Sequence, residues 1–413
     1  MDRSGEAESP YAWVRLGISV LLMTIGGSGM YSVTVALPLI QQEFGIARSS
    51  ASLPYAATMI GFGVGGVLMG RLSDRFGVVV PVLIGAAGLA AGYIAAGLSG
   101  GLWQFSLAQG LLIGLLGTSA TFAPLVADIS HWFVRRRGMA VAVCASGNYV
   151  AGAIWPPLME HFFETSGWRA TYIGLGIFSL VAAIPLAWLM RRRAPAYQRS
   201  QSAGAASARS TPSPHVLGLS GATLQTLLCV AGVACCVAMS MPQVHIVAYC
   251  GDLGYAAARG AEMMSLMLGF GIVSRLASGW LSDRIGGIRT LLVNSVLQCT
   301  ALVLFLPSDQ LSALYAASAL FGLFQGGLIP SYALIIREYF PAREAGARTG
   351  TVLMATLFGM ALGGWMAGAI FDLTGSYLPS FANAIGWNLL NMAIGLFLLH
   401  RSLRGPRALR PAI

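Results

Sequence analysis

The sequence predicts an all-α membrane protein with twelve transmembrane helices in two six-helix bundles. Of its 413 residues, 56% are hydrophobic and only 10% are charged, whereas a soluble domain carries about 25% charged residues. The apolar residues fall in long runs, and a helix that crosses a membrane needs about 20 of them. The second half of the chain also repeats features of the first half at a nearly constant offset.

The offset is clearest in a charged octapeptide. GRLSDRFG at 70–77 returns 209 positions later as GWLSDRIG at 279–286. The aromatic pair at 132–133 corresponds to 339–340, at an offset of 207, and FETSG at 163–167 corresponds to FDLTG at 371–375, at an offset of 208. Tandem halves in an apolar chain are typical of secondary transporters.

Twelve apolar runs are long enough to span the hydrocarbon layer, given a rise of about 1.5 Å per helical residue. In the first half we predict helices over 13–40, 51–70, 79–98, 103–129, 139–162 and 172–190. In the second half we predict helices over 219–249, 263–281, 290–306, 313–336, 349–371 and 379–400. The first run is too long for a cleavable signal peptide, so we expect it to remain as the first helix.

The domain boundaries follow from a change in composition between the halves. Residues 191–216 begin with three arginines and continue as a Ser/Ala/Gln/Pro mixture without periodicity, which cannot bury enough apolar area to fold. We therefore predict an N-terminal bundle over 1–190, a cytoplasmic linker over 191–216 and a C-terminal bundle over 217–413.

The arginines predict the orientation in the membrane. The chain has no lysine, and 21 of its 25 arginines fall on one side when the predicted loops are assigned alternately to the two sides. The other side receives only Arg48, Arg169 and Arg259, and Arg275 lies inside a helix. Because cytoplasmic loops carry the excess of basic residues, we expect both termini in the cytoplasm and a multi-pass protein of the cell inner membrane.

Several functional classes are disfavoured. The net charge of +10 follows from this topology bias, so we expect no nucleic-acid partner. The six cysteines lie mostly in apolar runs without metal-ligand spacing, and no Walker-type loop is present; we therefore expect no metal, no cofactor and no ATP-driven pumping. No nucleophile–base set at membrane depth indicates an enzyme.

The repeated octapeptide resembles the loop 2–3 motif of the major facilitator superfamily and its loop 8–9 repeat. The resemblance covers the whole chain and implies the major facilitator fold. It also implies that Asp74 and Arg75 act as a gate at the cytoplasmic surface, with Asp283 and Arg284 as the symmetric counterparts; a solvated helix end is the alternative. The chain departs from the motif after its first copy, where Val78 and Val79 replace the usual basic residues.

A narrower resemblance is to the monocarboxylate-porter and oxalate/formate-exchanger branch of that superfamily. It rests on four stretches: ISHWF at 129–133 with RRRG at 135–138, SG at 146–147, HIV at 245–247 with DLG at 252–254, and Arg275. The branch implies a small organic anion as substrate. Gly271 stands where mammalian-type carriers have an aspartate. Their lysine of the first helix is also missing, because this chain has no lysine, and Tyr31 lies near that position. The resemblance therefore does not imply proton coupling through those groups.

Arg275 is the main candidate for substrate binding. It lies eight positions before Asp283, about 12 Å inside the helix at the usual rise, where an arginine costs several kcal/mol unless it faces water or a partner. Its counterpart in the first half is Gly66, so the charge breaks the repeat. A planar guanidinium suits a carboxylate. The alternative is an arginine that is satisfied by backbone carbonyls or reaches the surface.

Other polar or aromatic side chains near the predicted middle of the membrane could complete the candidate site, although a single polar residue there more often serves a helix–helix contact. These candidates are Tyr31, Thr118, Phe122, Asn148, Tyr149, Gln325 and Tyr332. Related lactate carriers often have tyrosine where Phe122 precedes Pro124. We interpret His245 as a possible proton relay, with a structural role as the alternative, and Asp128 with Arg136 as part of a gate.

These observations favour a monomeric secondary carrier of a small monocarboxylate such as lactate or pyruvate, working by alternating access with protons as the coupling ion. Exchange of two anions remains open. The first alternative is a multidrug or other metabolite exporter of the same fold, although helix 139–162 contains WPP at 155–157 rather than the Gly-Pro kink of such exporters. A receptor without transport is a further alternative.

Overall fold

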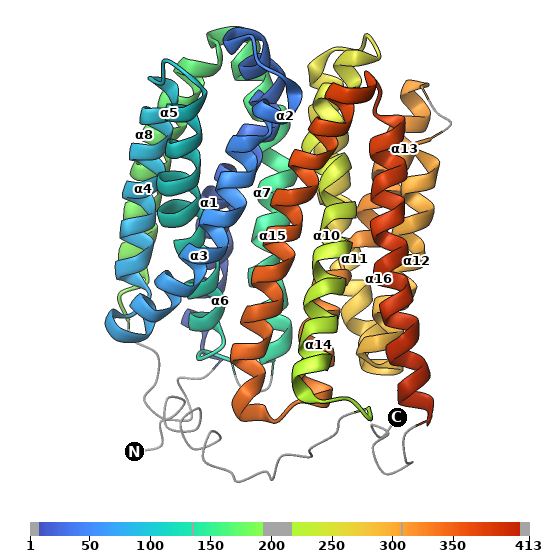
Figure 1. The fold of residues 1–413 in the computed structure, drawn as a ribbon. Coiled ribbons are helices and arrows are strands. Elements are labelled where there is room, and N and C mark those ends of the chain that lie inside the picture. Colours follow the sequence, from blue (N-terminus) through green and yellow to red (C-terminus); the bar gives the residue numbers. More distant parts are fainter. Residues whose placement is uncertain (1–7, 134–135, 193–216, 307–308, 405–413) are drawn as a thin grey trace. The chain divides into compact units, whose positions relative to one another are not determined.

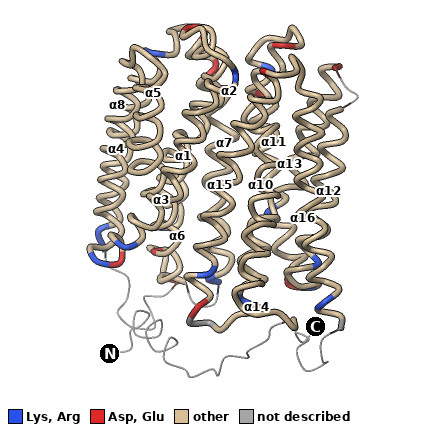
Figure 2. Tube along the Cα trace, viewed as in Figure 1, with Lys and Arg blue, Asp and Glu red and all other residues tan. Residues whose placement is uncertain are grey.

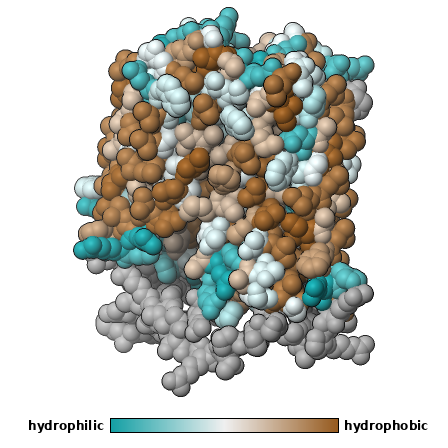
Figure 3. All heavy atoms as spheres, in the orientation of Figure 1, coloured by the Kyte–Doolittle hydropathy of each residue, from teal (hydrophilic) through white to brown (hydrophobic). Residues whose placement is uncertain are grey.

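The computed structural model describes residues 8–133, 136–192, 217–306 and 309–404, with the side chains of 342, 343 and 404 excepted. Within these ranges the chain is helical and has no strand, and twelve spans are long and apolar enough to cross a membrane. The predicted fold class is therefore confirmed. Figure 2 shows the charged residues concentrated near the ends of the helices, and on the face in Figure 3 hydrophobic atoms cover the middle of the helices.

The first half of the chain forms α1 (Pro10–Phe44), α2 (Arg48–Ala51), α3 (Leu53–Phe76), α4 (Val79–Gly97), α5 (Leu102–Leu107), the π-helix η2 (Ala108–Thr118), α6 (Ala123–Ile129), α7 (Arg137–Ser166) and α8 (Trp168–Leu189). The second half forms α10 (Gly221–Asp252), α11 (Ala257–Ile285), α12 (Gly287–Leu304), α13 (Leu311–Gln325), α14 (Leu328–Tyr339), α15 (Ala342–Thr374) and α16 (Leu378–Arg404). The predicted runs 103–129 and 313–336 are each interrupted.

The helices pack into two compact units, and each unit is described by itself. Unit 1 comprises residues 1–201 and 243–269, and unit 2 comprises residues 202–242 and 270–413. The last part of α10 and the first part of α11 therefore belong with the helices of the first half. The division of the sequence at 191–216 stays a prediction, because most of that linker lies outside the described residues.

In unit 1 the most extensive helix packing is between α1 and α7 and between α4 and α8 (Figure 1). Glycines allow some of these approaches: a Cβ at Gly27 of α1 would overlap the Cβ of Ala151 in α7. Small residues of this kind serve helix packing in lipid, where hydrophobic contacts give no advantage over lipid tails. We call the side of each unit on which its octapeptide lies the motif end, and the opposite side the distal end. The same names are used for the helix ends on those sides.

In unit 2, α12 packs against α13, α14 and α16. A polar network joins three of these elements: Tyr332 Oη donates to Asn391 Oδ1 at 2.9 Å, and Asn391 Nδ2 donates to Ser295 Oγ at 2.6 Å. Tyr332 and Asn391 are fully buried. Because buried polar groups need partners, this network fixes the register of α14, α16 and α12 relative to one another.

Candidate substrate site

The two interrupted helices lie at matching positions of the sequence repeat. The first break is a turn at Thr121-Phe122 between η2 and α6, and the second is a turn at Gly326-Gly327 between α13 and α14. Each break precedes a proline, Pro124 or Pro330, which lacks the N–H that would continue the helix. Interrupted helices in corresponding positions of two repeats point to the binding site of a transporter.

The first break is packed against α1 in unit 1. A Cβ at Gly26 would overlap the side chain of Thr121, and one at Gly29 would meet Thr118 Oγ1 at 2.5 Å. Thr118 is 2% exposed, and its hydroxyl has no hydrogen-bond partner among the described residues. The glycines thus bring α1 close to a break that presents a hydroxyl with spare hydrogen-bonding capacity.

Four further predicted residues lie near this break. Phe122 is half-buried and meets Phe62 of α3 edge to face, with ring centroids 5.8 Å apart. Tyr31 is 6% exposed and donates to the backbone carbonyl of Asn148 at 3.2 Å, while Asn148 itself is half-buried and Tyr149 is buried. The break and the middle of α1 and α7 therefore bring the predicted N-terminal residues into one region of unit 1.

Arg275 lies beside the second break, within unit 2. It is half-buried in α11. The hydroxyl of the preceding Ser274 accepts a hydrogen bond from the Gly326 amide at 3.0 Å, and a Cβ at Gly326 would lie 2.9 Å from the Arg275 amide nitrogen. Gln325, the last residue of α13, is fully buried. The predicted arginine and amide thus belong to one helix crossing.

Tyr332 occupies a different environment from the other predicted binding residues. Its hydroxyl is used by Asn391, and none of its surface is exposed. This placement gives Tyr332 a packing role in unit 2. The sequence pattern could not separate the two roles, because a tyrosine at mid-membrane depth fits both.

The two octapeptides form matching turns at the motif ends of α3 and α11. Gly77 has φ +83° and Gly286 has φ +81°, values that favour glycine. The amide of Gly77 donates to the backbone carbonyl of Ser73, and that of Gly286 donates to the backbone carbonyl of Ser282. The predicted gate residues of both copies are exposed to solvent: Asp74, Arg75, Asp283 and Arg284. In the second copy the Glu338 carboxylate accepts from the Gly287 amide at 2.8 Å and caps α12.

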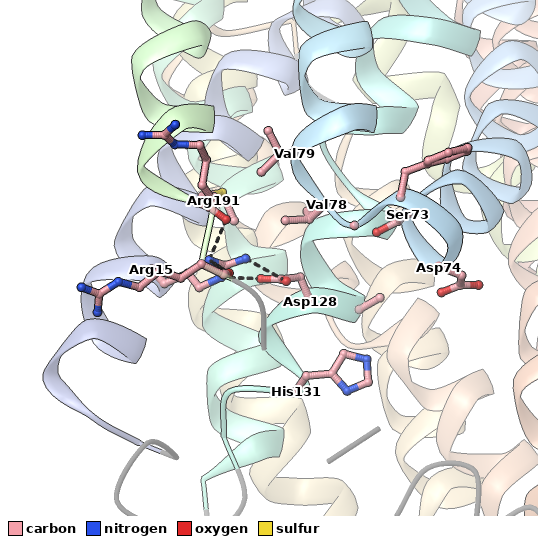
Figure 4. A pocket seen from close by; sticks show the side chains of 13 residues that line it. Arg15, Ser73, Asp74, Val78, Val79, Asp128, His131 and Arg191 are labelled. Atoms are coloured by element: carbon pink, nitrogen blue, oxygen red, sulfur yellow. Dashed lines mark hydrogen bonds and ion pairs between the residues drawn. The ribbon is translucent and has the colours of Figure 1, made fainter. Parts of the chain in front are cut away.

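A cavity of about 410 Å³ lies at the motif end of unit 1. Asp74 and His131 border it on different sides, with Arg15 and Asp128 joined beside them (Figure 4). Arg15 Nε and Nη2 donate to the two Asp128 oxygens at 2.7 and 2.9 Å, and Nη1 donates to the carbonyls of Met190 and Arg192. The cavity is therefore lined by an ion pair between a buried arginine and a half-buried aspartate.

This pair corrects the expected environment of Asp128. The sequence placed Asp128 beside Arg136, but its partner is Arg15 of α1, which is 1% exposed and also lies 4.8 Å from the ring centroid of Trp132. The Arg136 amide donates to Glu8, and its guanidinium lies 6.0 Å from the centroid of Trp13. Nearness in sequence was misleading because α6 ends between Asp128 and the arginines.

A second ion pair lies at the distal end of unit 1. Arg48 of α2 donates to both oxygens of Asp252 at the end of α10, at 2.8 and 3.1 Å. A second contact joins α11 to α7: Leu268 of α11 packs so closely against Gly152 of α7 that a Cβ at Gly152 would overlap it. His245 of α10 is fully buried. The distal parts of α10 and α11 are thus held to the first-half helices by a charged contact and by close packing.

The sequence prediction did not single out Glu160 of α7. This residue is 5% exposed, and its Oε2 atom is buried without a hydrogen-bond partner in the described part of the chain. Its signal was an acidic residue inside the predicted run 139–162. Among the residues the structure describes, no group of three His, Cys, Asp or Glu side chains could hold a metal ion.

Comparisons with known proteins agree with this architecture. The family model described as Major Facilitator Superfamily matches residues 18–312. Monocarboxylate transporter 13 of Bos taurus is 28% identical over 85% of this chain and 79% of its own length, and human monocarboxylate transporter 11 is 24% identical over 92% of this chain and 81% of its own length. The crystal structure of a bacterial homologue of the human lysosomal transporter Spinster, inward-facing and occupied, gives a TM-score of 0.74 at 14% identity, covering 98% of this chain and 100% of that one.

Proposed function

Because this chain belongs to the major facilitator superfamily, we propose that it is a secondary carrier of a small monocarboxylate such as lactate or pyruvate. It is a multi-pass membrane transporter and not an enzyme. The observation that carries the substrate proposal is Arg275, a cation inside membrane-spanning α11 and beside the interruption between α13 and α14. The names of relatives that are 24–28% identical support the same class of substrate.

In this proposal the Arg275 guanidinium binds the carboxylate of the substrate. Its planar fork forms two parallel hydrogen bonds with a carboxylate and stays charged at any working pH. Gln325 binds from the same helix crossing of unit 2. Within unit 1, the predicted binding residues Thr118, Tyr31 and Asn148 offer hydroxyl and amide groups. Phe122 and Tyr149 add apolar surface beside these groups of unit 1, and most small-molecule sites are largely apolar.

Transport proceeds by alternating access, with each substrate-binding event shifting an equilibrium between two conformations. The motif ends face the cytoplasm, as the arginine distribution indicates, and the carrier works as a monomer in the cell inner membrane. Arg48–Asp252 closes the distal end, and Asp74, Arg75, Asp283 and Arg284 act at the cytoplasmic ends. Protons are the coupling ion, with His245 as a possible relay.

A second candidate function is transport of a larger metabolite, in either direction. It is favoured by a relative of another substrate class: riboflavin transporter MCH5 of Saccharomyces cerevisiae is 24% identical over 74% of this chain and 61% of its own length. Phe122 supports it as well, because an aromatic ring offers no hydroxyl to a small acid but can stack on a ring system.

A thermal-shift screen of short organic acids on the purified carrier tests the proposal. A ligand at a hundred times its Kd stabilises the protein by about 2.7 kcal/mol, so lactate or pyruvate should raise the melting temperature. The amides of the same acids, which lack the negative charge, should not. Arg275→Ala should abolish the shift, whereas Arg289→Ala, which removes an exposed arginine of α12, should retain it. A shift with riboflavin alone would favour the second candidate.

A further inference from the structure

Glu160 is the one acidic side chain of the described residues that is buried and has an oxygen without a partner. It lies six residues before the end of α7 at Ser166, about 9 Å from the distal end at the usual rise. An ionised carboxylate in such a place costs several kcal/mol unless it is paired. The protonated, neutral acid costs much less to bury, because it carries no charge and leaves only the Oε2 atom without a hydrogen-bond partner among the described residues.

The charged groups around the distal end do not remove this cost. The Asp, Glu, His and Arg residues of unit 1 at that end, from α7 itself and from α1, α2, α8, α10 and α11, are His161, Glu164, Glu43, Arg48, Arg169, His245, Asp252, Arg259 and Glu262. The three arginines each have a carboxylate partner other than Glu160: Arg169 pairs with Glu43, Arg48 with Asp252 and Arg259 with Glu262. Glu164, one turn further along α7, is exposed and adds negative charge.

The face of α7 that carries Glu160 meets the distal part of α11. Ser265 Oγ of α11 donates to the carbonyl oxygen of Ala153, and Leu268 packs against Gly152. Glu160 is seven positions beyond Ala153, and positions seven apart lie on one face of a helix. Because α7 and α11 run in opposite directions, the residues of α11 that continue this contact toward Glu160 precede Ser265. Separation of α11 from α7 at the distal end would expose the carboxyl to water.

We propose that Glu160 is a proton-binding site that links closure of the distal end to the external pH. On closing, the Glu160 carboxylate takes one proton from the water on that side and becomes a carboxylic acid, and on opening it returns the proton to the same side. The closed form therefore holds one more proton than the open form, so a rise in pH favours opening. The inference rests on the proposed function in assuming that the distal end opens and closes and that it faces the outside.

Distance measurements between two spin labels test the site without any substrate. In a variant without the six native cysteines, cysteines replace Thr165 of α7 and Ala256 before α11, which are both exposed. As the pH rises from mildly acidic to mildly alkaline, the ratio of open to closed protein should rise by up to about tenfold per pH unit, the limit for one linked proton. A parent protein whose distances ignore pH contradicts the proposal directly.

Variants assign the response to this residue. Glu160→Gln, a neutral isostere, should remain closed at every pH, and Glu160→Met, which also removes the titratable group, should behave alike. Glu160→Asp should retain the response, and so should the matched control Glu164→Gln on the exposed neighbouring turn. If Glu160→Gln or Glu160→Met opens with pH like the parent, the proposal is wrong. A protein that shows the pH response but binds no acid would keep the proton site and lose the substrate proposal.

Discussion

Arg15 and Glu160 are both buried ionisable residues of unit 1, but their surroundings differ. Arg15 has two carboxylate oxygens, two backbone carbonyls and the Trp132 ring around its guanidinium. Glu160 Oε2 has no partner among the described residues. The first arrangement stabilises one charged state and holds α1, α6 and the end of α8 together. The second leaves the protonation state free to depend on conformation.

Arg15→Ala should destabilise the protein, because it leaves the Asp128 carboxylate, only 11% exposed, without its partner. Breaking such a pair from one side costs roughly 3–5 kcal/mol. Thermal unfolding of the purified protein in detergent measures the effect. Arg191→Ala, which removes an exposed arginine from the rim of the same cavity, is the matched control and should unfold at the parent temperature. Equal melting of both variants and the parent would contradict the structural role of the pair.

Tyr332→Phe should lower stability without changing the affinity for substrate. The variant leaves Asn391 Oδ1 buried without its donor, which costs roughly 1–3 kcal/mol. Thermal unfolding and the concentration dependence of acid uptake, measured side by side, separate the two effects. A large increase in KM with an unchanged melting temperature would return Tyr332 to the binding site that the sequence predicted.

At the scale of helices, the sequence predicted all twelve spans but neither interruption. Hydropathy averaged over 20 residues stays high across Pro124 and Pro330, so runs 103–129 and 313–336 read as single helices. The breaks follow from the missing proline N–H and from α1 and α11 packing closely against them. The partner of Asp128 and the burial of Glu160 were equally hidden, because both depend on contacts between helices that are distant in sequence.

The pair of Arg48 and Asp252 joins elements from opposite halves of the sequence at the distal end of unit 1. Arg48→Asp and Asp252→Arg should each favour opening of that end, because like charges then face one another, and the double swap should restore closure. Reaction of a cysteine at Leu268, 2% exposed in the parent, with a membrane-impermeant reagent reports opening. Single variants that react as slowly as the parent would show that the pair does not hold the end closed.

At the scale of the whole molecule, the repeat and the arginine distribution carried the prediction. The conserved offset of about 208 positions between landmarks indicated tandem halves, and the family match is consistent with that reading. The sequence did not indicate that residues 243–269 pack into the same unit as the first-half helices. That grouping is defined by contacts in the folded chain, whereas the repeat describes its covalent order.

The arginine distribution also predicts the orientation, which labelling in intact cells can test. A cysteine at Thr165, at the distal end of α7, should react with an impermeant reagent added outside. A cysteine at Arg71, at the motif end of α3, should react only after the membrane is permeabilised. Both positions are exposed. The reverse pattern would place the octapeptides outside and overturn the assignment of the gates.

Uptake of labelled lactate and pyruvate into proteoliposomes tests the central claim most directly. The parent protein should accumulate one of these acids when the external side is acidic. Arg275→Ala should lower the rate by roughly tenfold to a hundredfold, the value of hydrogen bonds to a charged group. Arg275→Lys should recover little, because the forked geometry is lost, and Arg289→Ala should match the parent. Uptake by Arg275→Ala at the parent rate would contradict the assignment of the carboxylate to this arginine.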